Sequence, residues 1–139
     1  MSEQNVEVVK KIMTMFESGN FDGLESLMAE NAVDHQTMPG IEATGREGFK
    51  AMVTAMRTAF PDIHSHVDDI IDAGDKVVIR STMHGTNTGE MMGMPPTGKS
   101  ITAQSIDIIR FENGMAVEHW GITEELQMMQ QLGLIPSDH

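Results

Sequence analysis

Residues 117–133, VEHWGITEELQMMQQLG, carry the clearest structural signal in the chain. The residues up to Gly121 are typical of a strand, and those that follow are typical of a helix. Thr123 can cap this helix, two glutamates lie in its first turn, and Gly133 supplies a stop. We therefore expect the last strand to lead into a short C-terminal helix, with His119 near the end of the strand.

The rest of the chain divides into a helical first part and a strand-rich second part. Apolar residues recur at helical spacing, for example Val6, Val9 and Phe16, and a T-x-x-E capping box begins at Thr44. Helices are predicted at residues 5–18, 22–29 and 44–60, a brief strand and a loop at 31–40, and further strands at 63–72, 76–86, 101–111 and 115–121. This order predicts an α+β fold with an antiparallel meander.

Length and charge restrict the organisation and the partners of the protein. A chain of 139 residues is expected to form a single domain over residues 1–139. Its formal net charge of −12 repels nucleic-acid phosphates and anionic lipids, so neither nucleic acid nor a membrane is an expected partner. The sequence shows no secretory signal and no window of about 18 apolar residues. We therefore expect a cytoplasmic protein.

The residue types that are missing exclude several kinds of chemistry. The chain has no Cys, so disulfides, thiolate metal sites and cysteine nucleophiles are excluded. It also has no Tyr, so no phenol can act as a proton donor. His64 and His66 have a spacing that can begin a metal site, but no third ligand follows at a recognisable offset. No metal site is expected.

The turn ENG allows two registers for the last hairpin, and the register sets which side chains share a face. A two-residue loop places Ile108 opposite His119. A three-residue loop with a bulge places Asp107 opposite His119, and Ser105 opposite Gly121. We favour the three-residue loop because it gives an apolar wall interrupted by one polar cluster, as in the wall of a binding pocket.

In this register Asp107 and His119 form a candidate acid/base pair, with Cβ atoms about 5 Å apart. A carboxylate beside an imidazole fixes the tautomer of the ring and raises its pKa, which makes a general base. The alternative is that the pair is a structural hydrogen bond, or that the other register holds and Asp107 is solvated.

Six fragments of the chain occur together in a known family. They are DHQTMPG (34–40), GREGFKAM (45–52), FPD (60–62), GMPPTGKS (93–100), IDIIRFENGMAVEHW (106–120) and QQLG (130–133). In this order and spacing the chain resembles the SnoaL-like polyketide cyclases, or ester cyclases, over about residues 5–135. The resemblance implies the nuclear transport factor 2-like fold: a cone-shaped, curved antiparallel sheet on three N-terminal helices, with a deep apolar cavity. It also implies a homodimer through the outer face of the sheet.

The resemblance implies an activity as well. In the founding cyclases an aspartate near the end of the last strand is the acid/base for the intramolecular aldol closure of a polyketide methyl ester. No cofactor is needed, because flanking carbonyls acidify the reacting carbon. That aspartate position falls on Gly121 here, and the neighbouring position on the preceding strand, a histidine in the founding members, is Asp107.

Two interpretations follow from this departure. The carboxylate has moved across the hairpin to Asp107, and His119 takes or shares the role of the base. Alternatively, the pocket is retained and the protein is a non-catalytic binder of an apolar small molecule. For either, the expected ligand contacts are His35, Met83, Ser105 and Gly121.

Overall fold

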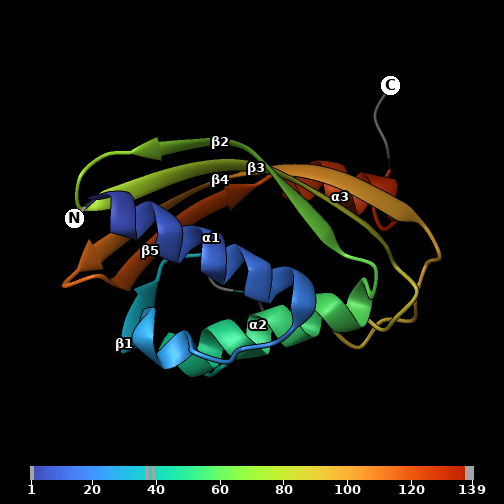
Figure 1. The fold of residues 1–139 in the computed structure, drawn as a ribbon. Helices are drawn as coiled ribbons and strands as arrows, with labels where there is room; N and C mark the ends of the chain where they lie inside the picture. Colours follow the sequence, from blue (N-terminus) through green and yellow to red (C-terminus); the bar gives the residue numbers. More distant parts are fainter. Residues whose placement is uncertain (1, 37, 39, 137–139) are drawn as a thin grey trace.

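A computed structural model describes residues 2–36, 38 and 40–136 (Figure 1). In chain order the elements are α1 (Ser2–Ser18), the 3₁₀ helix η1 (Leu24–Ser26), β1 (Met28–Asp34), α2 (Gly45–Ala59), β2 (His64–Asp72), β3 (Lys76–Thr86), β4 (Ser100–Glu112), β5 (Met115–Thr123) and α3 (Glu125–Gln131). The predicted α+β fold class is confirmed. None of the described helices is long and apolar enough to cross a membrane.

The five strands form one curved sheet in the order β1-β5-β4-β3-β2 (Figure 1). Strands β2 to β5 make the expected antiparallel meander. Strand β1 departs from that expectation, because it pairs in parallel with β5 and forms the edge beside it. Helix α1 packs against β2 and β3, and α2 packs against β1. Figure 1 shows the sheet curving over both helices, as the implied cone requires.

The helix predicted at residues 22–29 is wrong in extent. Only the single turn of η1 forms, after Gly23 in the left-handed conformation with φ 86°. The chain then enters the sheet, because the Ala116 N–H donates to the Leu27 carbonyl at 2.8 Å. Leu24 and Leu27 are nevertheless buried. The apolar spacing therefore indicated the core correctly, but hydrogen bonding to the sheet decided the backbone.

Helix α2 begins where expected, but not by the expected cap. Thr44 is the residue before the helix, and its side chain makes no capping hydrogen bond, so the predicted capping box is wrong. The chain enters α2 through Gly45, which has φ 64° and lies against β1. A Cβ at Gly45 would overlap the carbonyl oxygen of Glu30. Close backbone packing therefore sets the start of this helix, and only glycine fits there.

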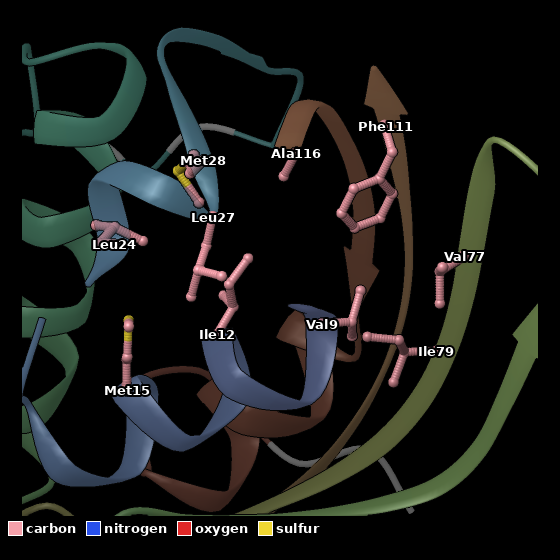
Figure 2. Packing of buried hydrophobic residues seen from close by; sticks show 10 residues of the cluster. All are labelled: Val9, Ile12, Met15, Leu24, Leu27, Met28, Val77, Ile79, Phe111 and Ala116. Atoms are coloured by element: carbon pink, nitrogen blue, oxygen red, sulfur yellow. The ribbon is translucent and has the colours of Figure 1, made fainter. Parts of the chain in front are cut away.

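The main hydrophobic core lies between α1 and the sheet (Figure 2). Its buried members come from α1, from the segment around η1 and from four strands: Val9, Ile12, Met15, Leu24, Leu27, Met28, Val77, Ile79, Phe111 and Ala116. Figure 2 shows Val9 of α1 beside Ile79 of β3, a contact that packs the helix against the strand. Each of these side chains other than alanine stabilises the fold by roughly 2 kcal/mol through its burial. On the inner face of β4, the polar residues Ser105 and Asp107 lie between this core and the buried Ile101 and Ala103.

Strand β3 alternates between residues that face the core and residues that face away from it. Ile79 and Ser81 are buried on the inner face, and Arg80 is exposed on the outer face. Met83 also faces inward, where it packs against a second core cluster that includes Phe60. Met83, which was expected to contact the ligand, therefore contributes to the packing of the core.

Candidate functional site

The β4–β5 hairpin turns through two residues, Asn113 and Gly114, with φ angles of 52° and 79°. Two successive left-handed residues are the geometry of a type I′ turn, which Asn-Gly favours. The predicted three-residue loop is therefore wrong. The strands pair directly from the turn, and a bulge at Val117 then shifts the register by one residue.

Beyond the bulge, Asp107 lies opposite Gly121, and Ile109 lies opposite His119. The favoured register, which placed Asp107 opposite His119, is thus in error by two residues. Side chains alternate with a period of two, so this error leaves Asp107 and His119 on one face as diagonal neighbours. The Nε2 atom of His119 lies 2.8 Å from Oδ1 of Asp107. The predicted contact is confirmed in spite of the wrong register.

A second carboxylate, which the sequence did not reveal, contacts the other ring nitrogen of His119. Parallel pairing of β1 with β5 places Asp34 beside His119. The Nδ1 atom of His119 lies 2.8 Å from Oδ1 of Asp34. The imidazole therefore bridges two carboxylates and joins three neighbouring strands. The exposed fractions of the side chains are 28% for His119, 21% for Asp107 and 42% for Asp34.

This arrangement determines the charge of the ring. A neutral imidazole has one N–H group, whereas an imidazolium has two and can donate to both carboxylates. Burial lowers the pKa of His119, but hydrogen bonds and charges from Asp107 and Asp34 outweigh it and raise the pKa to about 9. His119 is therefore a cation at neutral pH, and both of its N–H groups are occupied.

Gly121 makes room for this cluster. A Cβ at position 121 would overlap Oδ1 of Asp107 and Oε1 of Gln36, and it would lie 3.0 Å from Nε2 of His119. The carboxylate of Asp107 thus occupies the space that a side chain at position 121 would enter. The position of the Asp107 carboxylate therefore requires a glycine at position 121.

Two hydroxyl groups that contact each other, those of Ser105 and Thr123, lie next to the second carboxylate oxygen of Asp107. Ser105 Oγ donates to Oδ2 of Asp107 at 3.0 Å and lies 3.1 Å from Oγ1 of Thr123. Thr123 Oγ1 also accepts a hydrogen bond from the Gln36 side-chain amide at 3.1 Å. The hydroxyl of Thr123 therefore belongs to the site. Its predicted role as helix cap is wrong, because Glu124 is the N-cap residue of α3 and no side chain caps it.

An open depression of about 540 Å³ adjoins this cluster. Its lining comes from the loop after β1, the end of β5 and the start of α3: His35, Gln36, Gly121, Ile122, Thr123, Glu124, Glu125, Leu126 and Gln127. Gly121 is the lining residue that lies against the side chains of Asp107 and His119, which themselves stand behind the lining. The depression is open to solvent and mostly polar, unlike the deep apolar cavity that the resemblance implies.

His35 borders this depression but turns toward the outer face of the sheet. Its ring stacks on Trp120, with centroids 5.1 Å apart and an interplanar angle of 9°. Its Nε2 atom lies 2.7 Å from Oε2 of Glu118, whose other oxygen accepts from Arg110 at 2.9 Å. The hydrogen bonds from His35 and Arg110 lower the pKa of Glu118. Trp120 points away from the inner face, and His35 stacks on it there.

The predicted ligand contacts thus separate into three groups. Ser105 and Gly121 lie beside Asp107 and His119. His35 lies at the border of the depression, and Met83 packs in the second core cluster away from its lining. Three participants were missed: Thr123, which was predicted only as a helix cap, and the pair Asp34 and Gln36. Asp34 and Gln36 lie next to His35 in the fragment DHQTMPG, which was the available signal, but their contacts depend on the parallel β1–β5 pairing.

The chain matches the family described as "SnoaL-like polyketide cyclase" over residues 6–132. It belongs to the SnoaL-like polyketide cyclase family. Curated relatives include the aklanonic acid methyl ester cyclase DauD of Streptomyces sp. (strain C5), which is 27% identical over 96% of this chain and 83% of the relative. The corresponding cyclase DnrD of Streptomyces peucetius is 26% identical over 96% of this chain and 92% of the relative.

Solved structures agree with membership of the SnoaL-like family. IdmH from Streptomyces antibioticus superimposes with a TM-score of 0.80 at 33% identity, covering 94% of this chain and 99% of IdmH. TsrD from Streptomyces laurentii superimposes with a TM-score of 0.85 at 25% identity, covering 96% of this chain and 97% of TsrD. The curved sheet with its helices is therefore the fold that the resemblance implied.

Proposed function

We propose that this SnoaL-like protein catalyses a cofactor-independent ring closure of a polyketide ester, with Asp107 as the acid/base group. The observation that carries the proposal is the position of the Asp107 carboxylate. It fills the space above Gly121, contacts His119 at 2.8 Å and lies beside a depression large enough for a small molecule. The carboxylate that the founding cyclases carry on the last strand is supplied here from the neighbouring strand.

The roles of the two predicted catalytic residues differ in this proposal. His119 is already protonated at neutral pH, since its pKa is raised to about 9, so it does not serve as the base. Asp107 accepts one hydrogen bond on each oxygen and retains further lone pairs that can take a proton. His119 holds this carboxylate in place, and its positive charge stabilises negative charge that develops on a nearby substrate.

The reaction requires only proton transfer and the formation of one carbon–carbon bond. Asp107 removes a proton from the carbon between two carbonyl groups, and the electron pair of that C–H bond becomes an enolate. The enolate carbon attacks a second carbonyl carbon of the same molecule, whose oxygen becomes an alkoxide. The alkoxide takes the proton back from Asp107. The product is an isomer of the substrate, so no oxidant, reductant or cofactor is consumed.

The proposal predicts that Asp107→Asn abolishes most of the turnover. The amide keeps the size of the side chain but cannot accept the proton, so we expect the rate to fall about 100-fold or more. The measurement is the conversion of aklanonic acid methyl ester and nogalonic acid methyl ester, the compounds in the names of the relatives. Asp69→Asn, an exposed carboxylate on β2, is the matched control and should keep the full rate.

Two outcomes of this assay contradict the proposal. Full activity of the Asp107→Asn protein would show that another group is the base. If the wild-type protein is stabilised against heat by either ester but forms no product, it is a binding protein and the proposed reaction is wrong.

We further propose that the protein pairs with a second copy through the outer face of the sheet. Ile106 and Ile122 lie opposite each other there and are 52% and 79% exposed, and Ile71 on β2 is 51% exposed. Burying them against a second copy removes this apolar surface from water. Ile106→Glu is expected to give a monomer by sedimentation, whereas Thr54→Glu on α2 should leave the dimer intact. A wild-type protein that sediments as one chain would contradict the pairing.

A further inference from the structure

Asp34 lies on a different strand from the proposed acid/base group and yet contacts the same imidazole. It is the last residue of β1, and its register partner on β5 is His119. Just beyond it, the His35 N–H donates to the His119 carbonyl at 2.9 Å, which ties the end of β1 to β5. The backbone therefore sets the position of the Asp34 carboxylate relative to the ring.

The carboxylate itself is also held. Oδ1 of Asp34 accepts a hydrogen bond from the Gln36 N–H at 2.8 Å, and the same atom lies 2.8 Å from Nδ1 of His119. Two donors thus fix one oxygen, one of them from the backbone of the following turn. A carboxylate fixed in this way orients the ring that binds it, since the other ring nitrogen must then point toward Asp107.

Asp34 and Asp107 are the charged groups in contact with the ring. Asp34 approaches from β1 and Asp107 from β4, while Glu118, the neighbour of His119 in sequence, pairs with His35 and Arg110 instead. Among the described residues, no ion pair joins a helix to this imidazole. Both carboxylates therefore hold the ring, but of the two it is Asp107 that lies against Gly121, a residue that lines the depression.

We infer that Asp34 is a positioning residue: it fixes the His119 ring so that Nε2–H faces Asp107, and it keeps the ring charged while Asp107 exchanges a proton with the substrate. When Asp107 is protonated its negative charge is gone, and Asp34 is the remaining anion beside the imidazolium. His119 then keeps its proton, and the proton on Asp107 returns to the product. This inference rests on the proposed function, because it assigns the proton transfer to Asp107.

The test follows the titration of His119 by NMR and therefore needs no substrate. The ring C–H resonances of the 6 histidines are recorded against pH, and the His119→Gln variant identifies the resonance of interest. In Asp34→Asn the side chain keeps its size and can still accept a hydrogen bond, but it loses its charge. We expect the midpoint of the His119 titration to fall by about 1 unit or more.

Turnover against pH gives the second measurement. In Asp34→Asn the alkaline limb of the rate profile should move to lower pH, by the same number of pH units as the NMR midpoint. The value of kcat should fall about tenfold, and KM should change little. Asp68→Asn is the matched control. Asp68 also contacts a histidine, His66, at 3.0 Å, but it lies on the outer face of β2, so both measurements should be unchanged.

Two results overturn the inference. One is an unchanged His119 titration in Asp34→Asn, and the other is a shifted titration without a matching shift of the alkaline limb. A loss of activity from poor folding would lower the rate at every pH and would not move the limb. If the wild-type protein shows no turnover, the proposed function fails. The titration still decides whether Asp34 controls the charge of His119.

Discussion

Gly121→Asp is expected to lower turnover roughly 1000-fold, although it returns the carboxylate of the founding cyclases to its usual position. The reason is steric and electrostatic. The added Cβ overlaps Oδ1 of Asp107 and Oε1 of Gln36. The new carboxylate is also the third beside a single imidazolium, and like charges at close range repel. The ring and Asp107 are both displaced, and the variant protein should remain folded but inactive.

Exchanging the two positions should reverse much of this loss. In the double variant Asp107→His, Gly121→Asp the oxygen above position 121 is removed when the new carboxylate is added. The overlap with Asp107 and the third negative charge disappear together, so that only the flexible end of the Gln36 side chain still has to move, and the pair of residues found in the founding cyclases is restored. We expect the double variant to turn over at least tenfold faster than Gly121→Asp alone, which is a non-additive effect of neighbouring residues.

Two controls make this comparison decisive. Asp107→His alone supplies no acid/base carboxylate and should be as inactive as Asp107→Asn. Thermal unfolding of each variant shows whether the loss of rate is a loss of folded protein. If Gly121→Asp by itself keeps wild-type turnover, positions 107 and 121 are independent, and the expected compensation between them is contradicted.

The stability of the fold should depend on the charge of His119, and the effect should be large. Its pKa is about 9 in the folded protein against 6.5 for the unperturbed side chain, so the folded state binds the proton more tightly than the unfolded state. The resulting stabilisation is fully present below about pH 6.5, and it is lost as the pH rises through about 9. The difference is on the order of 3 kcal/mol in the free energy of unfolding.

Urea unfolding between pH 6 and pH 10 measures this dependence. The wild-type free energy of unfolding should decline most steeply between about pH 7 and pH 9, whereas His119→Gln should give a flatter profile. His66→Gln is the control, because that ring is 68% exposed and should leave the decline unchanged. A wild-type protein that is as stable at pH 9.5 as at pH 6 would contradict the proposed charge of the ring.

The strands and helices that depend on local pattern were largely predictable from the sequence. Apolar periodicity located α1, α2 and the four strands of the meander to within a few residues. The same periodicity misread the segment around Leu27, since a buried apolar spacing does not distinguish a helix from the entry to a strand when the sheet supplies the hydrogen bonds. Local pattern therefore predicted which residues are buried better than it predicted their backbone.

The candidate site was predictable only in part, and for a related reason. The contact of Asp107 with His119 required only that both side chains share a face, and that survives a register error of two residues. The bulge at Val117 has no signature that the hairpin sequence reveals. Asp34 is separated from His119 by 85 residues, and its contact depends on a parallel pairing that no local pattern predicts.

Strand β1, which carries Asp34, is an edge strand and is therefore the least stable part of the site. Strand β1 has a neighbour on one side only, and its pairing with β5 is interrupted between Met28 and Val33. Edges of this kind open at a lower free-energy cost than the whole protein. Each opening separates Asp34 from His119 while the inner β4–β5 pair stays closed. Fraying of β1 therefore changes the charge next to His119 for as long as the strand is open. The rate of hydrogen exchange at the His35 amide, which bonds to the His119 carbonyl, measures how often this happens.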